Sequence, residues 1–219
     1  MNNKVDEIKR HAVRLIAEKG FEAMSLRQLA AAVGVCPGSV YAHYESKGQL
    51  LQELYCDYLK DLMFVWVDQR KQDREKQSAE QMLMRFVAVY VGFYYRKAAE
   101  SLIVQLDFRS LDDQGKAMVN ELTELYEAEL GSILRQGMLD GVFQFCDLLS
   151  VQLAILCVLR GFCAAGCSAA PMPESWTIEA CVANAFRLAG VQQQCDPISQ
   201  HRVRTVSCKV RPSLSTIKS

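Results

Sequence analysis

Apolar residues recur every three or four positions along most of the chain, which is the spacing of one buried face on an α-helix. The first such stripe consists of Val5, Ile8, Ala12, Leu15 and Ile16. Further stripes predict helices at about 47–67, 78–94, 100–110, 112–137, 147–168 and 176–189. No stretch of useful length alternates apolar and polar residues as a β-strand would. The sequence therefore predicts an all-α fold.

The segment 25–34 predicts a short helix with clear signals at both ends. Ser25 and Gln28 have the Ser-x-x-Gln spacing of a capping box, in which each side chain bonds the backbone of the other residue. Gly34 stands where a left-handed residue would end the helix. Between these signals the apolar residues fall on one helical face: Leu26, Leu29, Ala30 and Val33.

A second short helix is expected over residues 37–44, because Pro37 suits the first position of a helix, where its missing N–H costs nothing. Ser46 and Gln49 repeat the capping spacing and start a longer helix at Lys47. Two short helices across a glycine-containing turn form a helix-turn-helix, whose second helix lies in the major groove of DNA. The helix over residues 5–19 is expected to pack behind this pair and complete a three-helix core.

These residues resemble the DNA-binding signature of the tetracycline-repressor (TetR) family of bacterial regulators. The matching residues are Gly34-Val35, Gly38-Ser39-Val40-Tyr41, His43-Tyr44 and Ser46-Lys47. The signature covers roughly the first sixty residues, and the remainder of the chain resembles the family only in helical layout and length. The resemblance implies an all-helical homodimer with a ligand-binding C-terminal domain. A look-alike segment inside an enzyme is the alternative, but cap, turn and signature all agree on one register.

Several side chains of this segment are candidates for DNA contact. The start of the helix at Lys47 offers free N–H groups and a positive charge to a phosphate. In similar proteins the positions of Tyr41, His43 and Tyr44 contact the DNA backbone, although Tyr44 suits packing against the first helix equally well. Arg27 has the planar donor pair that can bind guanine, with a phosphate contact or a solvated side chain as the alternative. The full candidate set is Ser25, Arg27, Pro37, Gly38, Ser39, Tyr41, Ala42, His43, Tyr44 and Lys47.

Two residues depart from the family pattern. Ala42 replaces the long polar residue that is common there and offers only a contact to a thymine methyl group. Cys36 replaces the usual serine cap, and a thiol is a poor cap. A cysteine at a helix N-terminus can have a lowered pKa, so a redox switch beside the DNA is one interpretation and an inert small residue is the other.

Charge does not by itself point to nucleic acid. The 219 residues carry 25 Lys and Arg against 25 Asp and Glu, a formal net charge of zero. Through Lys60 the count is eight basic against seven acidic residues. A dimer that docks through a few placed contacts per half-site does not need a highly basic domain, so the motif outweighs the charge count.

Location is expected to be cytoplasmic. The first twenty residues form a charged amphipathic run without the apolar core of a signal peptide. Nine cysteines, an odd number without CxxC spacing, favour a reducing compartment over a disulfide framework. The most apolar stretch, 148–167, contains Gln152 and Arg160, which favours a buried protein helix over a membrane span.

The second half of the chain offers candidates for ligand binding. Aromatic residues and a methionine on neighbouring helices could line a cavity, although such a stripe is more often simple core. Arg160 stands alone in an apolar helix, so it must pair or be partly exposed, and a ligand carboxylate or a partner-subunit acid would serve. The candidate set is Met82, Phe86, Tyr90, Phe93, Tyr94, Phe108 and Arg160.

A stripe of small residues predicts a dimer interface. The stripe lies on the helix expected at 147–168 and would let a second helix approach closely. Together with the helix expected at 176–189, it could form a four-helix interface about a two-fold axis. Tight packing within one subunit is the alternative. The residues concerned are Cys157, Gly161, Ala164, Ala165, Ser168, Val182, Ala185 and Ala189.

The sequence thus predicts a helix-turn-helix domain at 1–46, a helical ligand-binding and dimerisation domain at 47–190 and a tail without fixed structure at 191–219. The expected function is that of a dimeric repressor that binds a palindromic DNA operator and is released by a small-molecule effector. A DNA-binding protein without a small-molecule ligand, architectural or thiol-sensing, is the alternative. An enzyme is disfavoured because the three histidines, the serines and the acidic residues do not fall into a catalytic triad pattern. The sequence also has no glycine-rich phosphate loop and no metal-ligand spacing, so no cofactor or metal is expected.

Overall fold

A computed structural model describes residues 2–71, 77–166 and 172–191, and no strand occurs within these ranges. Their helices are α1 (Asn2–Lys19), α2 (Leu26–Val33), α3 (Pro37–Tyr41), α4 (Lys47–Lys71), α5 (Ala79–Arg96), α6 (Ala98–Leu106), the 3₁₀ turn η1 (Phe108–Ser110), α7 (Asp113–Leu139), α8 (Leu148–Gly166) and α9 (Glu174–Leu188). The prediction of an all-α fold is confirmed.

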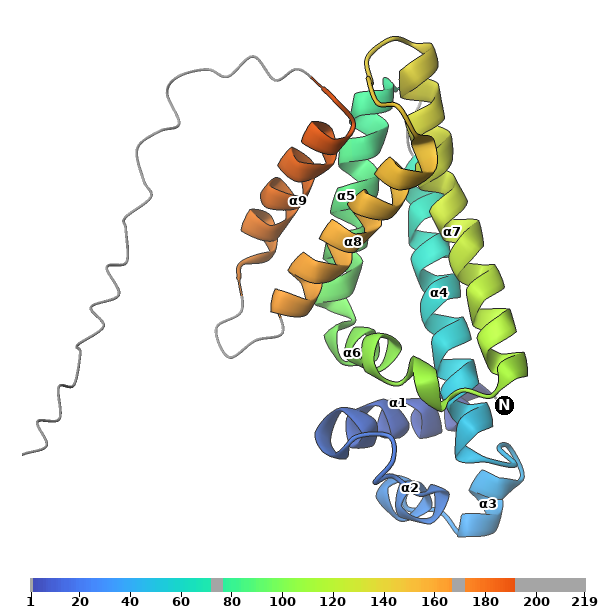
Figure 1. Cartoon of the computed structure of the whole chain (residues 1–219). Coiled ribbons are helices and arrows are strands. Elements are labelled where there is room, and N and C mark those ends of the chain that lie inside the picture. The colour runs from blue at the N-terminus through green and yellow to red at the C-terminus, as the bar shows by residue number, and fades with distance from the viewer. Residues whose placement is uncertain (1, 72–76, 167–171, 192–219) are drawn as a thin grey trace, which may run out of the picture.

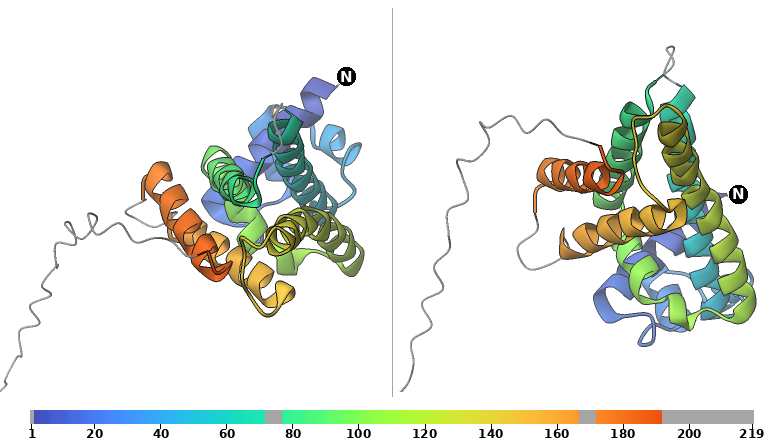
Figure 2. Two further views of the ribbon diagram at one scale, coloured as in Figure 1. Left: turned by 90° about the horizontal axis from the view of Figure 1, so that it is seen from above. Right: turned by 45° about the horizontal axis from the view of Figure 1, so that its top comes forward.

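The helices form a small group at one end and a larger group above it (Figure 1). Helices α1, α2 and α3 make up the small group, and α4 leads from it into the larger group beside α7. Seen from above, α9 lies on the outside against α5 and α8 (Figure 2). The helix α4 is therefore the covalent and structural link between the two ends of the molecule.

Two hydrophobic cores correspond to these two groups. The lower core is built on fully buried residues of α1 to α4, among them Ile8, Leu29, Val40 and Leu50. It also includes side chains from outside these four helices, namely Ile103 of α6, Leu111 between η1 and α7, and Val119 of α7. The upper core contains Trp66, Leu83, Phe86, Leu130 and Ile155. Because the lower core takes in residues of α6 and α7, the small group is packed onto the larger one.

The capping signals read from the sequence place most helix ends. Both hydrogen bonds of the Ser25 capping box are present, and Gly34 ends α2 with φ 75°. Ser78 and Gln81 have the same Ser-x-x-Gln spacing and form a complete capping box at the start of α5, and Asp112 caps α7 by accepting a 2.7 Å hydrogen bond from the Gly115 N–H. These local signals hold because they need only neighbouring residues.

Several predicted helix ends are wrong. Helix α4 runs on to Lys71, and the single helix expected at 100–110 is α6 followed by the turn η1. Helix α3 ends at Tyr41, not at Tyr44, because Ala42 and His43 form a turn that buries Tyr44. Helix α7 continues past Gly137 to Leu139, and Gly141 with φ 74° comes after it. A Cβ atom at Gly137 would lie 2.0 Å from Cδ2 of Phe143, so this glycine makes room for a neighbouring ring.

The prediction that the apolar helix near residue 150 is buried is also wrong for the single chain. Only 22 % of Leu148–Ala165 is buried. By length and composition this stretch could cross a membrane, but a single helix of this kind also occurs in soluble proteins. Leu149 and Leu153 are 61 % and 48 % exposed, and Cys157 and Gly161 are exposed too. The expected tail lies outside the described residues beyond Val191.

Candidate nucleic-acid interface and ligand cavity

The turn between α2 and α3 is fixed by backbone hydrogen bonds at Gly34 and Val35. The Gly34 N–H donates to Ala31 O at 3.2 Å, and the Val35 N–H reaches back to Ala30 O at 3.0 Å. A positive φ at Gly34 makes this reversal accessible, since a residue with a Cβ would be strained there. The two helices are thus held at a set angle at the end of the molecule farthest from α9 (Figure 1).

Most predicted DNA-contact residues lie exposed on these two helices. Arg27 is exposed on α2, opposite the buried Leu26 and Leu29. Tyr41 is 46 % exposed although it is a large aromatic residue. The other exposed members of the set are Ser25, Pro37, Gly38, Ala42 and His43. This surface combines an arginine, hydrogen-bonding side chains and free helix ends, which are the groups that contact phosphates and base edges.

Tyr44 is inside the protein. Its side chain is 1 % exposed, and its hydroxyl donates to Glu53 Oε2 at 3.4 Å. Burial raises the pKa of Tyr44 to about 12. Of the two interpretations of Tyr44, packing against the first helix therefore fits the structure, and we leave this residue out of the DNA-contact set.

Lys47 points toward α1 and the turn after it. Its ammonium group donates to the Glu22 carboxylate at 3.1 Å and to the backbone oxygens of Glu22 and Phe21 at 3.3 and 3.4 Å. The hydrogen bond from Lys47 lowers the pKa of Glu22. A phosphate contact by Lys47 would require its ammonium group to leave these acceptors. The sequence did not predict them, because they lie 25 and 26 residues away along the chain.

Cys36 and Ser39 interact at the start of α3. The Cys36 Sγ and Ser39 Oγ atoms lie 3.1 Å apart, and this contact lowers the pKa of the thiol. The thiol makes no capping hydrogen bond to the helix. Ser39 is half-buried, so it is less available to DNA than its neighbours.

A cavity of about 340 Å³ lies among α4, α5, α6, α7 and α8, and we call it the tyrosine cavity. Five tyrosines contribute to its wall, together with leucines, one phenylalanine and a few polar residues. Its lining consists of Tyr55, Tyr58, Leu59, Leu62, Tyr90, Tyr94, Ser101, Val104, Gln105, Phe108, Val119, Asn120, Thr123, Tyr126, Glu127, Leu156 and Arg160. The volume lies at the lower end of the range for small-molecule sites.

Hydrogen bonds hold two of the cavity tyrosines in place. The Tyr55 hydroxyl can donate to Ile103 O at 3.0 Å or Val104 O at 3.1 Å, and the Tyr58 and Ser101 hydroxyls lie 2.9 Å apart. Burial raises the pKa of Tyr58 to about 12, against a smaller opposing effect of Ser101. These phenols are therefore protonated at neutral pH.

Arg160 pairs with Glu127 and its side chain is also 51 % exposed, so both outcomes allowed by its solitary position in an apolar helix occur. The guanidinium of Arg160 donates to Glu127 Oε1 from α8 to α7. Both residues line the tyrosine cavity. Neither a ligand carboxylate nor a partner subunit is needed to neutralise the arginine, because its acid comes from the same chain.

The structure divides the predicted ligand residues. Tyr90, Tyr94, Phe108 and Arg160 line the tyrosine cavity. Phe86 and Phe93 lie in the upper core, and Met82 lines a separate shallow pocket beside Arg70 and Glu129. Sequence reasoning missed the tyrosines of α4 and Tyr126 of α7. Helical spacing shows which side of a helix is apolar, but it does not show which apolar side faces an opening.

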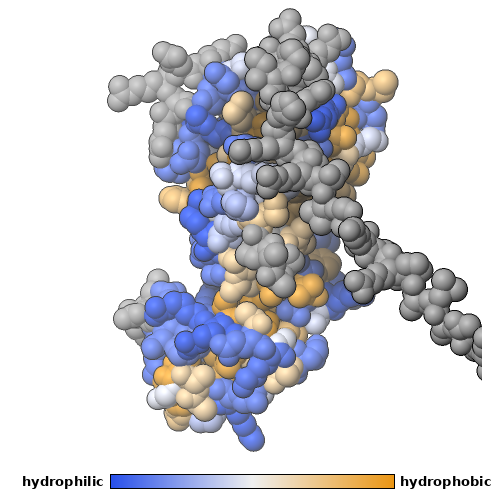
Figure 3. All heavy atoms as spheres, turned by 90° about the vertical axis from the view of Figure 1, so that its left-hand side faces the viewer, coloured by the Kyte–Doolittle hydropathy of each residue, from blue (hydrophilic) through white to orange (hydrophobic). Residues whose placement is uncertain are grey.

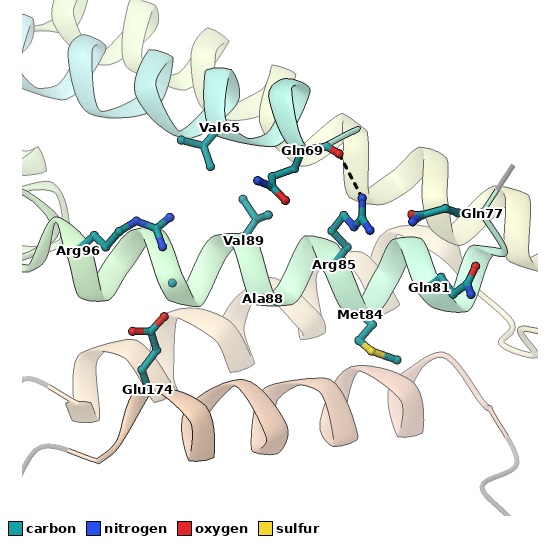
Figure 4. Close-up of a pocket in the computed structure, with 11 residues that line it drawn as sticks. Val65, Gln69, Gln77, Gln81, Met84, Arg85, Ala88, Val89, Arg96 and Glu174 are labelled. Carbon is teal, nitrogen blue, oxygen red and sulfur yellow. Dashed lines mark hydrogen bonds between the residues drawn. The ribbon is translucent and has the colours of Figure 1, made fainter. Parts of the chain in front are cut away.

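A second, more open hollow of about 530 Å³ runs along α5, and we call it the α5 groove. Figure 4 shows polar side chains along it, including Arg85, which donates to Gln69 O at 3.1 Å. Arg96 and Glu174 flank Gly92, where an added Cβ would lie 3.1 Å from each side chain. The groove is wider and more polar than the tyrosine cavity.

Comparison with known protein families gives a match for each of the two groups of helices. Residues 8–54 match the model of the bacterial regulatory proteins of the tetR family, and residues 76–163 match the tetracyclin repressor-like C-terminal domain. The chain belongs to the TetR family of transcriptional regulators.

Relatives and solved structures share this TetR arrangement. The fatty acid metabolism regulator protein of Bacillus subtilis is 25 % identical over 131 residues, 59 % of this chain and 66 % of its own. The HTH-type transcriptional repressor KstR2 of Mycolicibacterium smegmatis is 27 % identical over 143 residues, 64 % of this chain and 67 % of its own. A tetR-family regulatory protein from Rhodococcus RHA1 superposes with a TM-score of 0.81 at 23 % identity, covering 88 % of this chain and 100 % of its own. The alignments to the two relatives thus span about two thirds of those proteins, and the superposition supports the same fold.

In this TetR-family chain, one side of α8 exposes apolar and small residues to solvent. Its exposed members include most of the predicted small stripe, namely Cys157, Gly161, Ala164 and Ala165, together with Leu149 and Leu153. In the space-filling view from the side of α9, hydrophobic residues run up the middle of the face above a largely hydrophilic lower end (Figure 3).

Part of the predicted dimer set is not available to a partner. Ala185 and Ala189 are fully buried, because this side of α9 packs inside the chain on α5 and α8. Their place in the predicted interface is therefore wrong. Val182 is half-buried, and Ser168 lies outside the described residues.

Proposed function

We propose that this chain is a dimeric transcriptional repressor that binds a palindromic DNA operator through α2 and α3 and releases it when a small molecule enters the tyrosine cavity. The observation that carries the proposal is the surface of α2 and α3. A fixed helix-turn-helix presents Arg27, Tyr41 and His43 together, all exposed, at the free end of the molecule. The name of one relative, a transcriptional repressor, supports the direction of regulation.

The DNA contacts divide by chemistry. Arg27 is the base reader, because its two parallel N–H donors match the O6 and N7 acceptors of guanine. Tyr41 and His43 reach phosphates on either side of the groove, and Ser25 with the ends of the helices adds neutral hydrogen bonds. Pro37, Gly38 and Ala42 have small side chains that let α3 approach the bases closely. Ser39 and Lys47 contribute less to DNA binding than their positions suggested, because Ser39 is half-buried and Lys47 bonds to Glu22.

The effector half of the proposal rests on the tyrosine cavity. It is lined by α4, which begins at the helix-turn-helix, and by Phe108 of η1. A molecule that shifts α4 or η1 changes the spacing of two recognition helices in a dimer. We place the domain boundaries at 1–46 and 47–190, with 191–219 as a tail, and propose a cytoplasmic location, as for a soluble regulator of DNA.

A dimer is proposed through the exposed side of α8. Its apolar and small residues would otherwise face water along a whole helix, and a two-fold axis lets one surface cover its own copy. The arrangement also supplies the two half-site readers that a palindrome requires.

Selection of bound fragments from genomic DNA tests the proposal. We expect one enriched site with two-fold symmetry, its half-sites about one helical turn or 34–36 Å apart, and binding that weakens as salt rises. Binding to all fragments alike would instead support an architectural DNA-binding protein. Absence of DNA binding at low salt would rule out both.

A further inference from the structure

One wall residue of the tyrosine cavity has a hydroxyl group without a hydrogen-bond partner. Tyr126 is 3 % exposed, and its ring stacks on Phe86 with centroids 4.9 Å apart. Its hydroxyl makes no hydrogen bond to any described residue. By contrast, the hydroxyls of Tyr55 and Tyr58 in the same cavity are both bonded. Native chains rarely keep a buried polar group unpaired, so this hydroxyl calls for a partner from outside the chain.

The Tyr126 hydroxyl is suited to donate. Burial raises the pKa of Tyr126 well above its usual value, with smaller contributions from the neighbouring Tyr90 and Tyr58. It is therefore protonated and uncharged at neutral pH. The hydroxyl oxygen is closed to solvent, so contact with a ligand needs a small movement of the surrounding side chains.

The cavity offers no free charge to a ligand. Its ionisable lining, apart from the neutral tyrosines, is Glu127 and Arg160, which pair with each other. A carboxylate on the ligand would compete with Glu127 for the guanidinium of Arg160 and lie beside its like charge, and an amine would compete with Arg160 for Glu127, so both are less favourable than an uncharged group. The rest of the lining is largely aromatic and aliphatic, which favours an apolar ligand body.

We infer that the tyrosine cavity binds an uncharged, largely apolar molecule with a carbonyl oxygen, and that this oxygen accepts a hydrogen bond from Tyr126. Ketones, esters and thioesters belong to this class, whereas free carboxylic acids, which are ionised at neutral pH, do not. The inference rests on the proposed function for its biological meaning, because it names the kind of effector that the cavity would admit.

Calorimetric titration with two matched probes, 2-decanone and decanoate, tests the inference at pH 7.5. They share chain length and differ in the charge at the oxygen-bearing end. We expect 2-decanone to bind the wild-type protein at least about tenfold more tightly than decanoate. The variant Tyr126→Phe should bind 2-decanone about three- to tenfold more weakly, the effect of one neutral hydrogen bond.

Thermal unfolding without ligand separates this role from a structural one. Tyr126→Phe removes an unpaired polar atom, so its melting temperature should equal or exceed that of the wild type. The matched control Tyr55→Phe removes a hydroxyl that is bonded to backbone oxygens, so its melting temperature should fall. A third variant, Glu127→Gln, frees Arg160 and should raise the affinity for decanoate relative to 2-decanone.

Three results would overturn the inference: no binding of 2-decanone, equal or tighter binding of decanoate to the wild type, or an unchanged 2-decanone affinity in Tyr126→Phe. Operator binding, measured on the same samples without probe, reports on the proposed DNA-binding function separately. Failure of the probes with intact operator binding overturns the ligand class alone, and loss of operator binding in the wild type overturns the proposed function.

Discussion

Arg27 occupies the exposed side of α2, two residues after the Ser25 cap and opposite the buried Leu26 and Leu29. The rest of the motif surface reads bases poorly, since Ala42 offers a methyl contact and Ser39 is half-buried against Cys36. Sequence preference therefore depends strongly on this one arginine. Its guanidinium differs from an ammonium group because it can donate two parallel hydrogen bonds to one base.

We predict that Arg27→Ala weakens operator binding by about 1–3 kcal/mol and relaxes the choice at one guanine in each half-site. Arg27→Lys should restore binding to non-specific DNA, because it restores charge, but not the guanine preference. Titration of both variants against operators substituted at each half-site position measures this. Equal losses on every sequence would show that Arg27 contacts phosphate and that DNA shape supplies the specificity.

At the scale of elements, glycines within α7 show how packing fixes helix positions. Gly137 faces Phe143, whose ring would lie 2.0 Å from an added Cβ. Gly131 faces the end of the flexible Gln152 side chain, 2.6 Å from an added Cβ. The two sites share a helix but differ in whether the neighbour can move away.

Gly137→Ala should lower the free energy of unfolding by about 1–3 kcal/mol, because the Phe143 ring must repack. Gly131→Ala should change it by less than about 1 kcal/mol, since the helix propensity of alanine offsets a small shift of Gln152. Urea unfolding of the two variants gives both values. A stability at Gly137→Ala equal to the wild type would mean that Phe143 has free space to withdraw.

At the scale of the whole molecule, contacts join the two ends beyond the covalent link of α4. The Ser110 hydroxyl of η1 donates to Glu22 Oε1 at 3.3 Å, and Lys47 bonds the other oxygen of the same carboxylate. Ser110 lies two residues after Phe108, which lines the tyrosine cavity. A change at the cavity thus has a short physical route to the helix-turn-helix, within each subunit of the proposed dimer.

Gly161→Glu should convert the proposed dimer into monomers, because it adds a charge to the exposed stripe of α8. In the single chain no neighbouring atom lies within 4 Å of an added Cβ at this position, so the change should not disturb the fold. Affinity for a palindromic operator should then fall by about a hundredfold or more, since the two half-sites no longer act together. Size-exclusion chromatography and operator titration provide the two measurements.

Phe64→Glu is the control for this change, because it also introduces a glutamate at an exposed uncharged position. Phe64 is 71 % exposed and lies on α4, away from the proposed interface. This variant should remain a dimer. An unchanged elution volume for Gly161→Glu, or dissociation of Phe64→Glu, would place the interface elsewhere than on α8.

The sequence by itself determined the features that depend on neighbouring residues. The stripes gave the helices, and Ser25 with Gln28, Gly34, Ser78 and Asp112 gave their ends, because caps and left-handed turns need only residues a few positions apart. The family signature lies in the same local segment. The sequence likewise required Arg160 either to pair or to reach solvent, since an isolated charge in an apolar helix is costly to bury, but it could not name Glu127.

Tertiary structure alone decided which buried stripe faces a cavity and which faces core. Phe86 and Tyr90 lie one helical turn apart on α5, yet only Tyr90 lines the tyrosine cavity. It also decided that Ala185 is enclosed while Gly161 is exposed, and that Lys47 turns to Glu22. These outcomes depend on side chains that lie far apart in the chain, and the periodicity of one helix says that a face is apolar without saying what will cover it.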